Sequence, residues 1–170
     1  MPQGDPFSTN GKIQGMNLLK IAIAAFSATN TMTTFSYLLS ASYKKLFKEP
    51  VMMNFILEGM GIYLKGKWHK LGGWIAHYII GFALVITYEA IWRYTPVKFG
   101  FLSGILFGII SGLIGIMCWR ALYLTSIHDD VSRRSYYIQL FFGHILFAIA
   151  VVIAFKIFKY DPISKIEPYL

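Results

Sequence analysis

Four long apolar runs follow one another along the chain and are separated by polar segments. A helix needs roughly 20 predominantly apolar residues to cross the hydrocarbon core of a bilayer, and each run is long enough to do so. The pattern predicts an all-α integral membrane protein, a left-handed or mixed four-helix transmembrane bundle in one domain. We expect the spans at about residues 17–41, 72–92, 99–124 and 135–158. Residues 1–16 and 159–170 are expected to be a polar N-terminal segment and a polar tail outside the bilayer.

The segment between the first two runs carries a shorter helical signal. Pro50 suits the first position of a helix. Apolar residues then recur at helical spacing over about residues 50–63, at Val51, Met52, Phe55, Ile56 and Met60. Because this stretch is too short to span a bilayer and lysines flank it, we expect a short amphipathic helix lying at the interface.

Composition excludes two other protein classes. Only 14% of the residues are charged, whereas soluble proteins carry about 25%. Disordered chains are polar and poor in aromatic residues, but 56% of this chain is hydrophobic and 17% is aromatic. The chain is therefore expected neither to be soluble nor to be disordered.

The net charge of +8 comes from basic residues at the ends of the apolar runs. This placement is typical of anchors to anionic lipid headgroups rather than of a nucleic-acid-binding face. We expect contact with the lipid bilayer and no nucleic-acid partner. With four spans, the first and third loops hold nine Lys and Arg against seven in the remaining polar segments. This distribution favours both termini outside the cytoplasm.

A row of glycines marks the third run, at Gly100, Gly104, Gly108 and Gly112. Spacing by four keeps small residues on one stripe of a helix, where another backbone can approach closely. We expect this row to pack against a helix of the same bundle. A seam between copies of the chain, or a groove for a lipid tail, is the alternative.

Two histidines, His77 and His144, lie inside the second and fourth runs. Counted from the same side of the membrane, they lie within about 6 Å of each other in depth. Both should face inward, since lipid offers no hydrogen-bond partner. Asn30, on the polar face of the first run, and Tyr88, on the face of His77, are further candidates. The pair could bind a proton, a small ligand, haem or a metal ion, or form ordinary structural hydrogen bonds.

The remaining candidates carry weaker signals. Glu89 precedes Arg93 by four residues, which favours an ion pair at the membrane edge over a proton relay. His69 and His128 lie in loops on the side of the histidine pair and are the other candidate metal ligands, but no usual metal-ligand spacing is present. The single cysteine, Cys118, excludes an intrachain disulfide. No motif for a nucleophile, a phosphate or a dinucleotide is present, so an enzyme is disfavoured.

The second and fourth runs also carry a resemblance to a family, through Gly66-Lys67-Trp68, Gly73-Trp74-Ile75-Ala76-His77-Tyr78-Ile79-Ile80-Gly81 and Gly143-His144. These strings resemble a group of small, functionally uncharacterised bacterial inner-membrane proteins with four spans. The resemblance implies a multi-pass protein of the bacterial inner membrane and draws attention to His77 and His144. The first run departs from the pattern, because Met32-Thr33 stands where those proteins often have a Met-Asp pair.

Together these features predict a non-enzymatic integral membrane protein, either an accessory subunit of a larger membrane complex or a small structural or stress-related factor. Its partner would then be another membrane protein or a second copy of the chain. The alternative is a carrier or binder of a proton, an ion or a small lipophilic ligand through His77 and His144, with haem or a metal ion as a less favoured ligand.

Overall fold

The computed structural model describes residues 7–123 and 133–158, and every regular element in these ranges is a helix. The elements are α1 (Phe7–Tyr43), α2 (Glu49–Gly59), α3 (Lys67–Tyr94), α4 (Phe101–Tyr123) and α5 (Arg133–Ile157). The predicted all-α fold class is confirmed for the described residues.

Three of the described helices are long and apolar enough to cross a membrane: α3, α4 and α5. The prediction of a multi-pass membrane protein is therefore supported, but only three of the four predicted spans meet this criterion. Helix α1 is long enough at 37 residues, but Ser, Thr and Asn fill residues 27–34 and dilute its apolar character. The four-helix bundle, and with it the placement of both termini on one side, stays a prediction.

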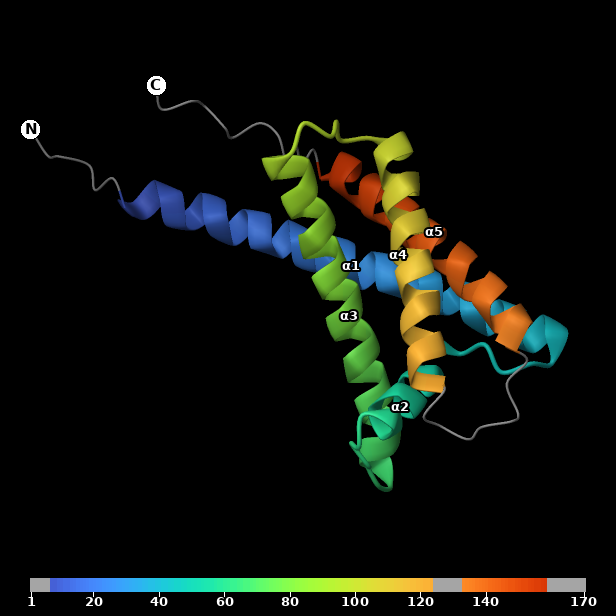
Figure 1. Ribbon diagram of the computed structural model, residues 1–170. Helices are drawn as coiled ribbons and strands as arrows, with labels where there is room; N and C mark the ends of the chain where they lie inside the picture. Colours follow the sequence, from blue (N-terminus) through green and yellow to red (C-terminus); the bar gives the residue numbers. More distant parts are fainter. Residues whose placement is uncertain (1–6, 124–132, 159–170) are drawn as a thin grey trace, which may run out of the picture.

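The helices do not stand as four parallel neighbours. In Figure 1, α3 rises, α4 descends and α5 rises again, while α1 crosses them obliquely and α2 lies at the lower end of α3. Helix α5 makes the most extensive contacts, with α4 and with α1, and α3 packs on α1 and α2. A short link joins α3 to α4, but their backbones come close at few points. Large side chains bridge the two helices instead: the Tyr88 hydroxyl pairs with that of Ser111, and the Trp92 indole donates to Ser103.

Several helix boundaries differ from the predicted ones. Helix α1 begins ten residues before the predicted span, and α3 begins at Lys67 instead of residue 72. The apolar pattern marks the hydrocarbon core, about 30 Å thick, but the 28 residues of α3 extend to about 42 Å. A helix can therefore continue well beyond the apolar run that identifies it.

Helix α2 ends earlier than the predicted helix at 50–63, because a glycine terminates it. Gly61 has a φ of +82°, and the backbone N–H of Ile62 donates to the carbonyl of Leu57 at 2.8 Å. This is the Schellman arrangement that closes a helix at its C-terminus. Its first residues are buried and pack against α3, so α2 is part of the packed structure.

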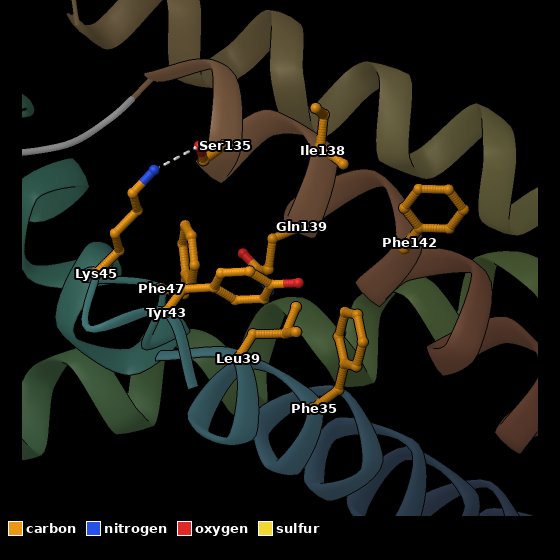
Figure 2. A pocket seen from close by; sticks show the side chains of 9 residues that line it. All are labelled: Phe35, Leu39, Tyr43, Lys45, Phe47, Ser135, Ile138, Gln139 and Phe142. Atoms are coloured by element: carbon orange, nitrogen blue, oxygen red, sulfur yellow. Dashed lines mark hydrogen bonds between the residues drawn. The ribbon is translucent and has the colours of Figure 1, made fainter. Parts of the chain in front are cut away.

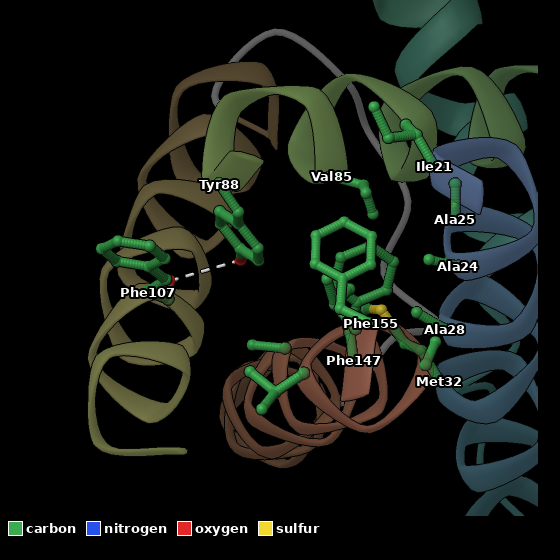
Figure 3. Close-up of a cluster of buried hydrophobic side chains, with 14 of the residues drawn as sticks. Ile21, Ala24, Ala25, Ala28, Met32, Val85, Tyr88, Phe107, Phe147 and Phe155 are labelled. Carbon is green, nitrogen blue, oxygen red and sulfur yellow. Dashed lines mark hydrogen bonds between the residues drawn. The ribbon is translucent and has the colours of Figure 1, made fainter. Parts of the chain in front are cut away.

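Small side chains let α1 approach α5. Figure 3 shows Ala24 and Ala28 of α1 pointing toward α5, where Phe147 and Phe155 fill the space between α1 and α3. All four side chains are buried. Such packing stabilises helix pairs in lipid, where association gains nothing from excluding water.

The glycine row packs α4 against α5. A Cβ atom added at Gly108 would lie 2.7 Å from the Cα atom of Ile145, and one added at Gly104 would lie 2.6 Å from a methyl group of Val152. Gly112 faces Phe141 at 3.3 Å, whereas Gly100 has no such atom within 4 Å. Three of the four glycines thus lie at one intramolecular contact, and Gly100 does not belong to it.

Replacing Gly108 with Ala should lower the free energy of unfolding by roughly 1–3 kcal/mol, because the new methyl group forces two backbones apart. Thermal unfolding of the purified protein in detergent measures this loss. Gly100→Ala is the matched control and should cost far less. Equal melting temperatures for Gly108→Ala and the wild type would contradict the assigned contact.

Candidate functional site

A cavity of about 190 Å³ lies where α3 and α4 stand apart, and residues from all five helices line it. Most of the lining is apolar. The polar side chains in it are Thr29, Glu49, His77, Ser111 and His144. The structure therefore brings together both histidines that the sequence singled out.

His77 is 5% exposed and projects from α3 toward α1. Its Nε2 lies 3.0 Å from the hydroxyl oxygen of Thr33, and that hydroxyl donates its only proton to the carbonyl of Thr29 at 2.8 Å. The hydroxyl must therefore accept a hydrogen bond from His77, so Nε2 carries the proton of the neutral ring. Nδ1 is left with a lone pair.

His144 is 7% exposed and has the opposite tautomer. Its Nδ1 lies 2.8 Å from the carbonyl oxygen of Leu140, and because a carbonyl only accepts, Nδ1 carries the proton. The lone pair is on Nε2, on the side of Gly115, where an added Cβ would lie 3.6 Å from Nε2 and 3.2 Å from Cε1. Glycine leaves space beside the imidazole at this point of α4.

Neither lone pair, on His77 Nδ1 or on His144 Nε2, receives a hydrogen bond from a residue that the structure describes. The hydroxyl of Thr29, also in the lining, is buried without a partner in the same ranges. Unpaired polar groups in an apolar surrounding cost free energy. The two imidazoles thus offer hydrogen-bond acceptors to whatever enters the cavity, and the Thr29 hydroxyl can donate or accept.

Glu49 is the residue of this site that the sequence analysis missed. It is 1% exposed at the start of α2 and accepts a hydrogen bond from the amide of Gln139 on α5. Burial raises the pKa of Glu49 to about 7, against the lowering effect of hydrogen bonds from Gln139 and Ser36. An acid directly before a helix-starting proline was the available signal, but its burial depends on contact between distant helices.

Close contact between α2 and α3 carries Glu49 into the site. A Cβ atom at Gly73 would collide with the carbonyl oxygen of Pro50, so this glycine allows α2 to cross α3. The Gly73-to-Gly81 string therefore contributes a glycine at the helix crossing as well as His77 in the cavity.

The other predicted site residues lie outside the cavity. The amide oxygen of Asn30 accepts a hydrogen bond from Tyr78 at 3.0 Å, so this residue joins α1 to α3 but does not line the site. Tyr88 does not line the cavity either, but its hydroxyl forms a 2.7 Å hydrogen bond with that of Ser111, which does. Asn30 is therefore not among the residues that line the histidine cavity, whereas Thr29 and Thr33 of the same helix contribute to the site.

Glu89 pairs with Arg93 four residues later, which confirms the favoured interpretation of this acid. His69 lies 3.2 Å from a carboxylate oxygen of Glu58 and does not line the cavity. His128 lies outside the described residues. Two of the four candidate metal ligands, His77 and His144, thus border the cavity.

The residues in this cavity do not fit a metal ion or a haem. No group of three His, Cys, Asp or Glu side chains suited to a metal occurs in the described ranges. The volume of 190 Å³ lies below the roughly 300–1,000 Å³ of pockets that hold drug-sized ligands. A haem is at least as large as such a ligand and does not fit a cavity of this volume.

Comparison of the chain with protein-family models, with curated proteins and with solved structures gives no match. The resemblance noted in the sequence stays a prediction, and the site is interpreted from its own geometry.

Glu49 should make stability depend on pH. Its pKa of about 7 in the folded protein exceeds the ordinary value of 4.5, so the stabilisation is complete below about pH 4.5 and is lost as the pH rises through 7. At about 1.4 kcal/mol per pKa unit, the loss is about 3 kcal/mol. The stability of the wild type relative to Glu49→Gln should therefore decline between about pH 4.5 and 8, measured as the difference between their melting temperatures, because this comparison cancels the titration of the histidines that both proteins share.

Glu58→Gln is the control for this experiment, because Glu58 lies on the same helix but pairs with His69 near the surface. Its pH profile should follow that of the wild type. If the melting temperature of Glu49→Gln depends on pH in the same way as that of the wild type, Glu49 is not the group that causes the pH dependence.

Proposed function

We propose that the protein is a non-enzymatic membrane protein that binds a small lipophilic molecule in the histidine cavity. The observation that carries this proposal is the pair of imidazoles in one cavity lining whose lone pairs, on His77 Nδ1 and His144 Nε2, receive no hydrogen bond from the described residues. The molecule should therefore carry a donor group at its polar end.

The size of the cavity supports a ligand whose polar end is a single ring. An apolar protein cavity of about 150 Å³ is large enough to hold benzene, and this cavity measures about 190 Å³. A phenol or quinol ring fits this volume and supplies hydroxyl donors to the imidazoles. Any longer tail must extend out of the cavity.

The position of the cavity supports entry from the lipid. Ile80 on α3 and Ile114 on α4 both line it and are 44% and 54% exposed. Because the backbones of α3 and α4 come close at few points, the proposed tail leaves the cavity between Ile80 and Ile114. A lipophilic molecule would reach the site from the bilayer without crossing water.

Helix α1 is proposed as the fourth, oblique span. Leu18, Leu19 and Phe26 are exposed on it, as expected for a face in contact with lipid. Its polar residues are largely satisfied within the protein, for example by Thr31 donating to the carbonyl of Ser27. Four spans in the bacterial inner membrane agree with the family resemblance.

The accessory-subunit hypothesis has less support. An oligomeric seam would use the glycine row of α4, but α5 covers three of its four glycines. A membrane partner or a second copy would therefore need another surface. Simple proton binding by the histidines remains the second candidate, because both lone pairs accept protons.

Binding of 4-hexylphenol to the protein in nanodiscs tests the proposal, with hexylbenzene as the matched probe that lacks the hydroxyl group. One hydrogen bond is worth about 1 kcal/mol, so 4-hexylphenol should bind about fivefold more tightly. Cys118 lines the cavity and is the chain's one thiol. Its modification by a lipid-soluble maleimide should slow when the probe is bound.

The double variant His77→Phe/His144→Phe should remove this fivefold preference, since it deletes both lone pairs but keeps a ring at each position. His69→Phe, outside the cavity, is the control and should retain the preference. Equal binding of both probes to the wild type would contradict the proposed ligand class. A Soret band in the purified protein that His144→Phe abolishes would instead favour haem.

A further inference from the structure

A second hollow, of about 400 Å³, lies between the C-terminal part of α1 and the first three turns of α5. It is separate from the histidine cavity, and Figure 2 shows its lining. Phe35 and Leu39 come from α1, and Ile138 and Phe142 come from α5. We call this hollow the α1–α5 groove.

The two ends of the α1–α5 groove differ in polarity. At one end, the ammonium group of Lys45 donates to the hydroxyl of Ser135 at 3.1 Å, and at the other end Phe35 and Phe142 face each other across the groove (Figure 2). From Ser135 to Phe142, α5 rises by about 10 Å. The groove is therefore amphipathic along its length.

Positive charge gathers at the polar end. Lys44 and Arg134 are exposed and adjacent in sequence to Lys45 and Ser135. An ammonium group has three donors, and the bond to Ser135 uses one of those of Lys45. The acid behind the groove, Glu49, is buried and is bound to the floor residue Gln139.

The position of the polar end along α5 suits a membrane boundary. The candidate span of α5 is Arg134–Ile157, and a span of this extent puts Ser135 and Lys45 at headgroup level and Ile138 and Phe142 deeper along the same helix. Basic pockets at this level bind anionic headgroups, whose phosphate the lysine attracts. An apolar lining below the phosphate suits an acyl chain.

We propose that the α1–α5 groove binds an anionic phospholipid, with the phosphate at Lys45 and the upper part of one acyl chain between Ile138, Phe142, Phe35 and Leu39. This site does not depend on which ligand occupies the histidine cavity. Its occupant joins α1 to α5 at the end of the structure where Lys45 and Ser135 meet.

Native mass spectrometry of the whole protein, with dioleoyl phosphatidylglycerol or dioleoyl phosphatidylcholine added, measures lipid retention. Phosphatidylglycerol should be retained about fivefold more strongly, the factor expected for one lysine beside an anionic headgroup. Lys45→Gln should abolish this preference. Lys65→Gln removes the same charge from an exposed site in the α2–α3 link and should preserve it.

A second variant tests the acyl chain separately. Ile138 is exposed in the groove, so Ile138→Trp should fill the groove and reduce phosphatidylglycerol retention while leaving the melting temperature without lipid unchanged. Soluble glycerol phosphate should not stabilise the protein. Stabilisation by glycerol phosphate, unchanged lipid retention by Ile138→Trp, or a dimer that Ile138→Trp dissociates would each overturn the proposal.

Discussion

Close backbone approach to α5 is the constraint on which this structure depends. On one side, Gly104 and Gly108 bring α4 against α5; on another, alanines bring α1 against it. In lipid these contacts rely on dispersion and small side chains. The backbone of α3 comes close to α1 and α2 but at few points to α4, so α3 and α4 meet through large side chains and the histidine cavity lies between them.

Lipid offers no hydrogen-bond partner, so the polar residues of the helices must satisfy one another within the protein. Thr33 is an example. Its hydroxyl donates to the carbonyl of Thr29 and accepts from His77, so one side chain satisfies its own proton and the N–H of the imidazole. The same bonds fix the tautomer of His77, and the carbonyl of Leu140 fixes that of His144. The acceptor character of the two imidazoles is thus a consequence of how the helices satisfy their own polar groups.

Local patterns in the sequence predicted the features that depend on a single helix. Apolar runs located α3, α4 and α5, and spacing within the runs placed His77 and His144 on inward faces at similar depth. The i,i+4 spacing also identified the pair of Glu89 and Arg93. The sequence did not reveal the oblique path of α1 or the burial of Glu49, because both depend on which helix packs against which. It also assigned Asn30 to the histidine site, although Thr33, three residues later on α1, makes that contact.

Gln139 connects the two hollows of the molecule. Its side chain lines the α1–α5 groove, and its amide donates to Glu49, which lines the histidine cavity. Burial raises the pKa of Glu49 and the hydrogen bond from Gln139 lowers it, so a displacement of the Gln139 amide changes how readily Glu49 ionises. Since the pKa of Glu49 is about 7, modest changes at the groove alter its protonation near neutral pH. A neutral Glu49 in turn keeps the cavity uncharged, the condition under which a neutral lipophilic molecule enters at the lowest cost in desolvation.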